Sequence, residues 1–362
     1  EEYAQRLAQK APGECRNLYL VSGGSEANET AVKLARAYHV ARGEPGRHKV
    51  IGGSISYHGN TLGTLALSGR PRLRAPYLPL LPRSPSTPAP FCYHCPLGRT
   101  FPECRVACVD ELEVRILAED PKTVSAVIAE PILGASAGAA VPPEEYARRA
   151  REICTRHGVL LIDDEVMTGF GRTGRFFGIE WSSVSPDIVT CGKGMSGGYA
   201  PVGAVLASDS IVEALARAGG FTHGFTFSHN PVVAAACLET LRILDEEGLV
   251  ERSHRLGDVG ATLFARLLSH PHVGDVRGRG LFFGIELVLD RPSRRPFPRA
   301  EAIAEKVFTR AFEKGLVTYP STGCATGEEG DLILLAPPFV VTEEELARMA
   351  AILEETLSDL KL

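Results

Sequence analysis

Lysine is scarce in this chain: of its 39 basic residues, eight are lysine and the other 31 are arginine. Arginine keeps its charge in proteins, whereas a lysine in a dry site loses its proton readily. A reaction that needs a neutral amine therefore has few candidates. Of the eight, Lys193 alone stands among small and apolar neighbours, in the segment 191–198. We therefore expect Lys193 to have a chemical role.

Long apolar runs and clustered basic residues are also missing. No run reaches the roughly 18 to 20 apolar residues that a membrane-spanning helix requires. The net charge of −5 leaves no basic stripe for a nucleic acid backbone. A chain of 362 residues that is 44% apolar and 23% charged is not disordered, collagen-like or coiled coil. We expect a globular protein that acts on small molecules, with neither a membrane nor a nucleic acid partner.

Apolar runs and helical periods alternate in the larger, N-terminal part of the chain, as parallel α/β folds require. Strands are predicted at residues 18–21, 124–129, 159–162, 188–190 and 202–207, and helices from Ser25 and over 143–157, 231–247 and 250–269. After His270, the pattern predicts strands at 281–289 and 332–335 and helices at 299–314 and 342–357. We predict a large α/β domain over residues 1–270 and a smaller α+β domain over 271–362. Seven prolines between Pro71 and Pro90 predict a long loop there.

Three features fall at the carboxyl ends of predicted strands, where open α/β sheets bind their ligands. The turn 23–25 leads into a helix N-terminus, which can bind a phosphate, although most such turns only reverse the chain. Three acids end another strand, and alternation sends Asp164 to one side and its two neighbours to the other; acids there are more often caps or solvated. Lys193 lies between glycines, which let a ligand approach the backbone, but a loop lysine is usually solvent-exposed.

Together these features meet the needs of pyridoxal phosphate (PLP): a lysine for its imine, an acid that keeps its ring nitrogen protonated, and a helix N-terminus for its phosphate. Their order and spacing resemble the class III aminotransferases, which share PLP fold type I. The resemblance covers nearly the whole chain and rests on six motifs: Ser22-Gly23-Gly24-Ser25-Glu26-Ala27-Asn28-Glu29; Tyr57-His58-Gly59; Glu130-Pro131; Leu161-Ile162-Asp163-Asp164-Glu165-Val166 with 168–174; Gly192-Lys193-Gly194; and His223-Gly224-Phe225-Thr226. It implies a mostly parallel seven-stranded sheet in the large domain and a smaller α+β C-terminal domain.

The resemblance also implies which residues act. Lys193 would form the internal aldimine with PLP and move a proton between the substrate carbon and the cofactor. Asp164 would pair with the pyridinium nitrogen, a choice that alternation alone leaves open. Tyr57 and Val166 would pack on the two ring faces, although ordinary core packing is the alternative for both.

The remaining cofactor contacts are implied in the same way. Gly24 and Ser25 would hold the phosphate, and the motif residues His58 and Glu130 would also belong to the cofactor site. Phe225 and Thr226 would reach the phosphate of a neighbouring subunit's cofactor, which implies a homodimer with shared active sites.

Several positions depart from the family pattern. Met167 replaces a glutamine that many members use to bind the ring hydroxyl of the cofactor. Segment 319–331 contains no arginine to bind a substrate carboxylate, and Ala135 stands where a gating glutamate can occur. These departures favour an amine or ω-amino acid as the donor. Only 21 residues precede the Ser22 motif, whereas family members normally have a much longer segment, so we expect part of the small domain and one wall of the substrate pocket to be missing.

Cysteines suggest a second site. Cys92, Cys95, Cys104 and Cys108 form a C-x2-C-x8-C-x3-C pattern that could bind zinc, with His94 as an alternative ligand. The other interpretation is a reduced, loop-packing cluster or a redox-sensitive pair. The remaining five cysteines are scattered in mostly apolar settings, which suits a reducing cytoplasm.

The resulting hypothesis is a PLP-dependent aminotransferase. It would move an amino group from an amine, ω-amino acid or amino acid to a keto acid by a ping-pong mechanism through the Lys193 aldimine. One alternative is a PLP-dependent aminomutase or racemase of the same fold. An alternative of another class is a non-catalytic, zinc-anchored interaction protein.

Overall fold

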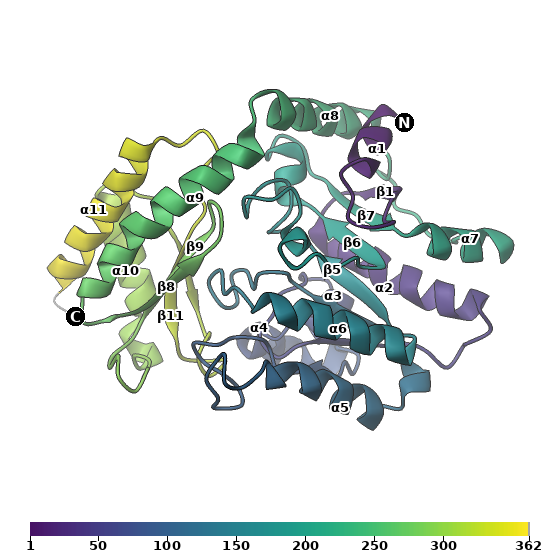
Figure 1. Ribbon diagram of the computed structural model, residues 1–362, viewed down its shortest axis with the longest axis horizontal. Coiled ribbons are helices and arrows are strands. Elements are labelled where there is room, and N and C mark those ends of the chain that lie inside the picture. Colours follow the sequence, from purple (N-terminus) through teal and green to yellow (C-terminus); the bar gives the residue numbers. More distant parts are fainter. Residues whose placement is uncertain (361–362) are drawn as a thin grey trace.

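The computed structural model describes residues 1–360, in which helices surround two β-sheets (Figure 1). The larger sheet has seven strands in the order β1-β7-β6-β5-β4-β2-β3. β7 is antiparallel to both of its neighbours, and the other neighbouring pairs are parallel. The mostly parallel seven-stranded sheet is thus confirmed. Its strands are β1 Asn17–Val21, β2 Lys49–Gly53, β3 Ser86–Thr87, β4 Val124–Ala129, β5 Leu160–Asp164, β6 Ile188–Cys191 and β7 Gly203–Ala207.

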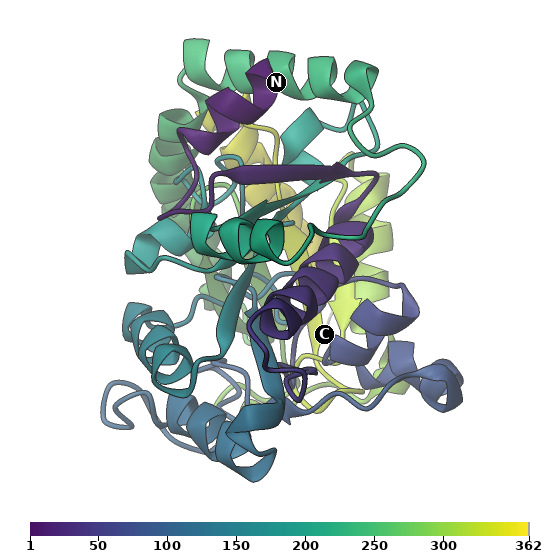
Figure 2. The ribbon, with the colours of Figure 1, turned by 90° about the vertical axis from the view of Figure 1, so that its right-hand side faces the viewer.

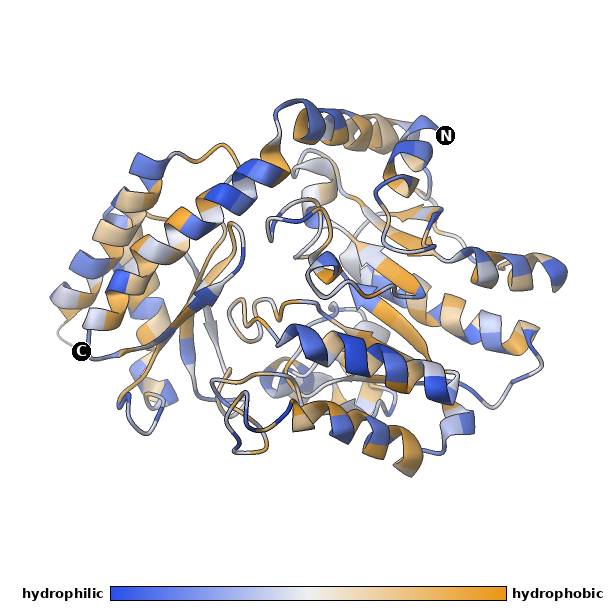
Figure 3. Ribbon diagram, in the orientation of Figure 1, coloured by the Kyte–Doolittle hydropathy of each residue, from blue (hydrophilic) through white to orange (hydrophobic). Residues whose placement is uncertain are grey.

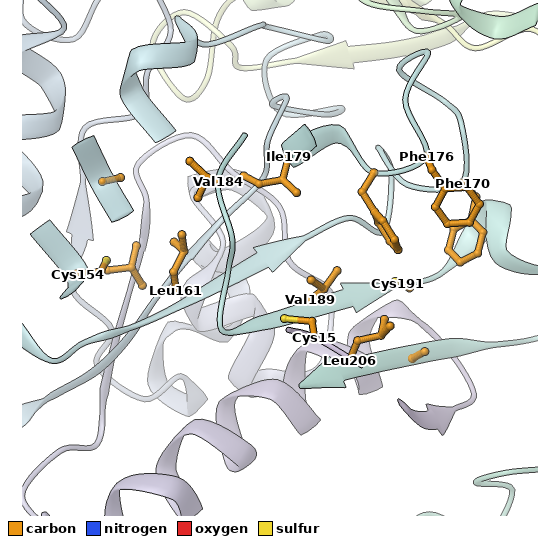
Figure 4. Close-up of a cluster of buried hydrophobic side chains, with 14 of the residues drawn as sticks. Cys15, Cys154, Leu161, Phe170, Phe176, Ile179, Val184, Val189, Cys191 and Leu206 are labelled. Atoms are coloured by element: carbon orange, nitrogen blue, oxygen red, sulfur yellow. The ribbon is translucent and has the colours of Figure 1, made fainter. Parts of the chain in front are cut away.

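Helices cover both faces of this sheet (Figures 1 and 2). Successive strand residues point to opposite faces, so Leu161 packs with α5 and α6 while Ile162 packs with α2 and α7. Figure 4 shows part of the first of these cores, where Leu161, Val189 and Leu206 lie on one face of the sheet. The helices are α1 Glu2–Ala8, α2 Gly24–Ala41, α3 Leu62–Leu67, α4 Pro71–Arg74, α5 Asp110–Ala118, α6 Glu144–His157, α7 Asp209–Arg217, α8 Pro231–Glu246 and α9 Leu249–Ala265.

The second sheet is antiparallel, with four strands in the order β10-β11-β9-β8. Leu256 and Phe264 of α9 pack into the same core as its strands and as helices α10 and α11, and α11 lies beside α9 (Figure 1). The C-terminal α+β arrangement is therefore confirmed, while a domain boundary at residue 270 stays a prediction. The elements are β8 Val273–Gly278, β9 Phe283–Leu287, α10 Ile303–Glu313, β10 Tyr319–Thr322, β11 Asp331–Leu335 and α11 Glu343–Leu360.

The proline-rich segment differs from its prediction as one long loop. A short helix, α4, begins at Pro71 because the fixed φ of proline suits the first helical position. A 3₁₀ helix follows at Ala75–Leu80, and Ser86–Thr87 pair with β2 at the edge of the large sheet. The sequence pattern also missed several short or weakly patterned elements: α1, α3, α5, α7, β2, β8 and β10.

Polar residues lie mainly on the outer helix surfaces, and apolar residues fill the centre of the large sheet (Figure 3). Within residues 1–360, no helix is both long and apolar enough to cross a bilayer.

Candidate active site

One edge of the large sheet gathers the predicted site residues. β4, β5 and β6 are parallel, so their carboxyl ends bring Glu130, Asp164 and Lys193 to the same edge. These side chains border a cavity of about 250 Å³. Its lining contains eight of the ten predicted cofactor-site residues together with Asn28, Gly59 and Met167; the eight are Gly24, Ser25, Tyr57, His58, Glu130, Asp164, Val166 and Lys193.

The start of α2 forms one wall of the cavity. Gly24 is its first residue, so the backbone N–H groups of Gly24 and Ser25 have no acceptor in the preceding turn. A Cβ on Gly24 would lie 2.8 Å from Cγ1 of Val166, which is too close for non-bonded carbons. Glycine is therefore required for Val166 to pack against the helix start.

Asp164 is buried and held by three groups. His58 Nδ1 lies 2.8 Å from Asp164 Oδ2, and Asn28 Nδ2 donates to the same oxygen at 2.8 Å. The backbone N–H of Val166 donates to Oδ1 at 3.1 Å. Burial opposes the charge of His58, but its hydrogen bond and attraction to Asp164 prevail and raise the pKa of His58. The three hydrogen-bond partners hold the Asp164 carboxyl group in place in the cavity wall.

Asn28 is a site residue that the sequence analysis did not single out. Thr190 donates to its side-chain oxygen at 2.7 Å, and Asn28 in turn donates to the backbone oxygen of His58 at 2.6 Å. It lies four residues after Gly24 and thus on the same face of α2, a spacing that could have identified it.

Lys193 follows β6 and enters the cavity from the sheet edge. Its side chain is exposed to the open cavity, yet the surrounding protein displaces enough water to lower its pKa; the charges of Asp164 and Glu130 oppose this effect. The backbone φ of Lys193 is 41°, a left-handed conformation that costs a non-glycine residue about 1–3 kcal/mol. Such strain is typical of functional positions.

Glu130 connects two loops of the cavity wall, one containing Tyr57 and the other containing Gly134. Its Oε1 accepts the backbone N–H of Tyr57 at 2.9 Å, and its Oε2 accepts that of Gly134 at 2.8 Å. Burial raises the pKa of Glu130, although its two backbone hydrogen bonds and His58 oppose the shift. Glu130 thus positions Tyr57, which is half-buried in the cavity wall.

The two acids beside Asp164 lie on the other side of the strand, as alternation predicts. Glu165 accepts backbone hydrogen bonds from Gly178 and Ile179 at 2.9 and 2.8 Å. Asp163 is buried, and burial together with the nearby Glu165 charge raises its pKa well above its usual range. Burial also raises the pKa of Glu165, and neither acid lines the cavity around Lys193.

Phe225 and Thr226 are not brought to this cavity within one chain. Phe225 packs against the ring of His223, with ring centroids 5.0 Å apart, and Thr226 is exposed. Their predicted contact with a neighbouring subunit's cofactor stays a prediction.

Similarity to known proteins agrees with this geometry. A family profile described as aminotransferase class-III matches residues 1–357. The chain belongs to the class III aminotransferases. A probable aminotransferase of Mycobacterium tuberculosis is 40% identical over 99% of this chain and 76% of its own length. An adenosylmethionine-8-amino-7-oxononanoate aminotransferase of Nitratidesulfovibrio vulgaris is 37% identical over 95% of this chain and 63% of its own length.

Two solved structures from the same family have a similar fold. An (S)-enantioselective omega-transaminase from Thermomicrobium roseum has a TM-score of 0.92 and 38% identity, covering 99% of this chain and 78% of its own. The omega-transaminase of Pseudomonas jessenii, solved in complex with PMP, has a TM-score of 0.92 and 34% identity over 99% of this chain and 78% of its own. These similarities confirm the fold and the aminotransferase family.

The residues of this class III aminotransferase fit the cofactor of its family. Free N–H groups at the start of α2 suit a phosphate, and the Asp164 carboxylate suits a protonated ring nitrogen. The buried Nε2 of His58 has no hydrogen-bond partner within residues 1–360, so a polar group could still bind there. The cavity lies just below the roughly 300–1,000 Å³ typical of small-molecule sites.

The four cysteines of the C-x2-C-x8-C-x3-C pattern line a separate cavity of about 20 Å³. All are free thiols, and burial raises the pKa of Cys92 and brings that of Cys108 to about 12, which opposes the thiolate form that zinc requires. His94 instead contacts Glu286. Across residues 1–360, no group of three or more histidine, cysteine or acidic side chains is arranged to hold a metal ion. Zinc binding at these four cysteines stays an alternative that rests on their spacing alone.

Proposed function

We propose that this class III aminotransferase binds PLP through Lys193 and transfers an amino group from an amine, ω-amino acid or amino acid to a keto acid in two half-reactions. The observation that supports the proposal most strongly is the meeting of Lys193, Asp164 and the start of α2 around one cavity. When bound, PLP supplies a ring that accepts electrons from the carbon next to the amine.

Each residue then has a distinct task. Lys193 Nζ would hold the cofactor's aldehyde carbon and would carry a proton to and from the substrate carbon. Its lowered pKa keeps more of the amine neutral, which this proton transfer requires. The Asp164 carboxylate, oriented by His58 and Asn28, holds a proton on the ring nitrogen.

Orientation and phosphate binding use the remaining residues of the cavity. Tyr57 and Val166 would pack against the cofactor ring, and the N–H groups of Gly24 and Ser25 would bind its phosphate. Met167 cannot donate a hydrogen bond to the ring oxygen, so another group must form the hydrogen bond to that oxygen.

A test of the proposed function separates the two half-reactions. Adding an amino donor alone to the PLP-loaded protein is expected to remove the cofactor's visible absorption, because the amino group stays on the cofactor. A keto acid added next should restore the absorption and yield a new amine in an equal amount. Absorbance spectra with product analysis follow both steps.

The alternatives give different outcomes. A racemase or aminomutase would convert a single amino compound without any keto acid, and that result would contradict the proposal. A non-catalytic interaction protein would remain colourless when mixed with PLP. The intact set of Lys193, Asp164 and Gly24 favours catalysis over that second alternative.

We also propose that the active protein is a homodimer, in which Phe225 and Thr226 of one subunit complete the phosphate site of the other. The same segment exposes large apolar side chains, with Phe227 67% and Val232 75% exposed. Apolar surface of this kind favours a protein partner.

The dimer proposal predicts the behaviour of Thr226→Ala. Losing one hydrogen bond to the phosphate should weaken PLP binding about 5- to 10-fold, while Thr222→Ala, which changes an exposed threonine four residues earlier, should leave the affinity unchanged. PLP titration measures the affinity, and analytical ultracentrifugation measures the mass. A monomer that binds PLP fully, or equal effects of the two substitutions, would refute the proposal.

A further inference from the structure

Arg70 lies where three segments meet at the edge of the candidate active site. Its Nη1 donates to the backbone oxygen of Ala135 at 3.2 Å. Ser321 of β10 donates its hydroxyl to the same oxygen at 2.7 Å. Arg70 therefore connects the segment before α4 with the loop after β4 and with β10.

Two short connections place this meeting point beside the cavity around Lys193. The residue before Arg70, Gly69, donates its backbone N–H to Ser56 Oγ at 3.1 Å, and Ser56 immediately precedes Tyr57. On the other side, Gly134 precedes Ala135 and is held by Glu130. Both Tyr57 and Glu130 line the cavity, and the charge of Arg70 interacts with both side chains, so the guanidinium lies close to residues of the cavity wall.

The Arg70 guanidinium has no anionic partner there. Within residues 1–360, its one side-chain hydrogen bond goes to the neutral carbonyl of Ala135, and no carboxylate forms an ion pair with it. A guanidinium has five N–H donors, so most of them stay available. Burial lowers the pKa of Arg70, while Tyr319, Cys324 and the more distant Glu130 oppose this effect. A half-buried cation without a counter-ion is costly, and an incoming anion would reduce that cost.

We propose that Arg70 binds the carboxylate of the amino acid or keto acid substrate. This inference rests on the proposed function, because it gives the same cavity its substrate class. Segment 319–331 supplies no arginine, yet Ser321 in its first strand and Arg70 donate to the same backbone oxygen of Ala135. A planar guanidinium binds a carboxylate through two parallel hydrogen bonds, so Arg70 makes carboxylate-bearing substrates better than plain amines.

A matched pair of donors tests the inference. 5-Aminopentanoate and pentylamine have the same five-carbon chain and differ in the terminal carboxylate. Arg70→Ala is expected to lower kcat/KM for 5-aminopentanoate about 10- to 100-fold, mainly through KM, because a hydrogen bond to a charged group is lost. The kcat/KM for pentylamine should stay nearly constant, because it reflects only the donor half-reaction, in which this amine presents no carboxylate. Arg70→Lys keeps the positive charge but lacks the planar guanidinium with its two parallel N–H donors. It should therefore lower kcat/KM for 5-aminopentanoate less than Arg70→Ala does.

Arg72→Ala is the matched control, since Arg72 is an exposed arginine of α4, the short helix that begins directly after Arg70. This substitution should change kcat/KM for neither donor. Pentanoate carries a carboxylate but no amino group that can react. Its Kd therefore measures carboxylate binding without turnover. Calorimetry of the PLP-loaded protein should show its Kd rising about 10- to 100-fold in Arg70→Ala.

The outcomes separate this inference from the proposed function. Equal losses with 5-aminopentanoate and pentylamine, or an unchanged Kd for pentanoate, would overturn the role of Arg70 while leaving aminotransfer intact. A wild-type protein that transfers no amino group would instead refute the proposed function, and pentanoate binding would still decide whether Arg70 binds carboxylates.

Discussion

Replacing Lys193 with alanine is expected to abolish amino-group transfer, with a loss of at least about 10⁴-fold in kcat. The methyl group of alanine can neither hold the cofactor nor carry a proton to the substrate carbon. The phosphate-binding start of α2 and the Asp164 carboxylate remain, so the variant should still bind PLP without a covalent bond. Steady-state rates with a keto acid acceptor and equilibrium dialysis of PLP measure the two effects.

Lys306→Ala is a suitable control because Lys306 is an exposed lysine on α10 in the C-terminal part of the chain. It should keep the rate of the unaltered protein. Multiple turnovers by Lys193→Ala would refute the assignment of Lys193.

The second large effect is expected from Asp164→Asn. An amide has nearly the shape of a carboxylate but no charge, so it cannot hold a proton on the ring nitrogen of PLP. We expect kcat to fall about 10²- to 10⁴-fold, with PLP still bound. Single-turnover kinetics with a donor amine would show the loss in the first half-reaction.

Asp163→Asn supplies a control one residue away. Asp163 points to the other side of β5 and does not line the cavity around Lys193. Its replacement leaves the cavity residues in place, so activity should stay close to that of the unaltered protein. Equal losses of kcat in the two variants would show that any substitution at the end of β5 reduces activity, and would contradict a specific role for the Asp164 charge.

The position of the site was predictable because it depends on local rules. Parallel strands carry ligand-binding residues at their carboxyl ends, and Glu130, Asp164 and Lys193 each follow or end such a strand. Alternation along β5 correctly separated Asp164 from Asp163, since the side-chain period of a strand is two. Their catalytic roles remain predictions that the proposed variants test.

Contacts between distant segments could not be read from the sequence. Asn28, His58 and Asp164 meet only after the chain folds, and they are separated by 30 and 106 positions along the sequence. Arg70 immediately precedes the proline-rich segment that was predicted as a long loop and the short helix α4 that begins it, and no sequence pattern linked it to Ala135 or Ser321. The cysteine spacing resembles a zinc site, but burial of the thiols decides their chemistry and is not visible in spacing.

The most direct test of the central claim is to locate the bond between PLP and the protein. The loaded protein is reduced with borohydride, which fixes the cofactor to whichever lysine holds it, and is then digested for peptide mass analysis. We predict that the added cofactor mass is found on the peptide containing Lys193 alone among the eight lysines. Its appearance on another lysine, or on none, would contradict the account.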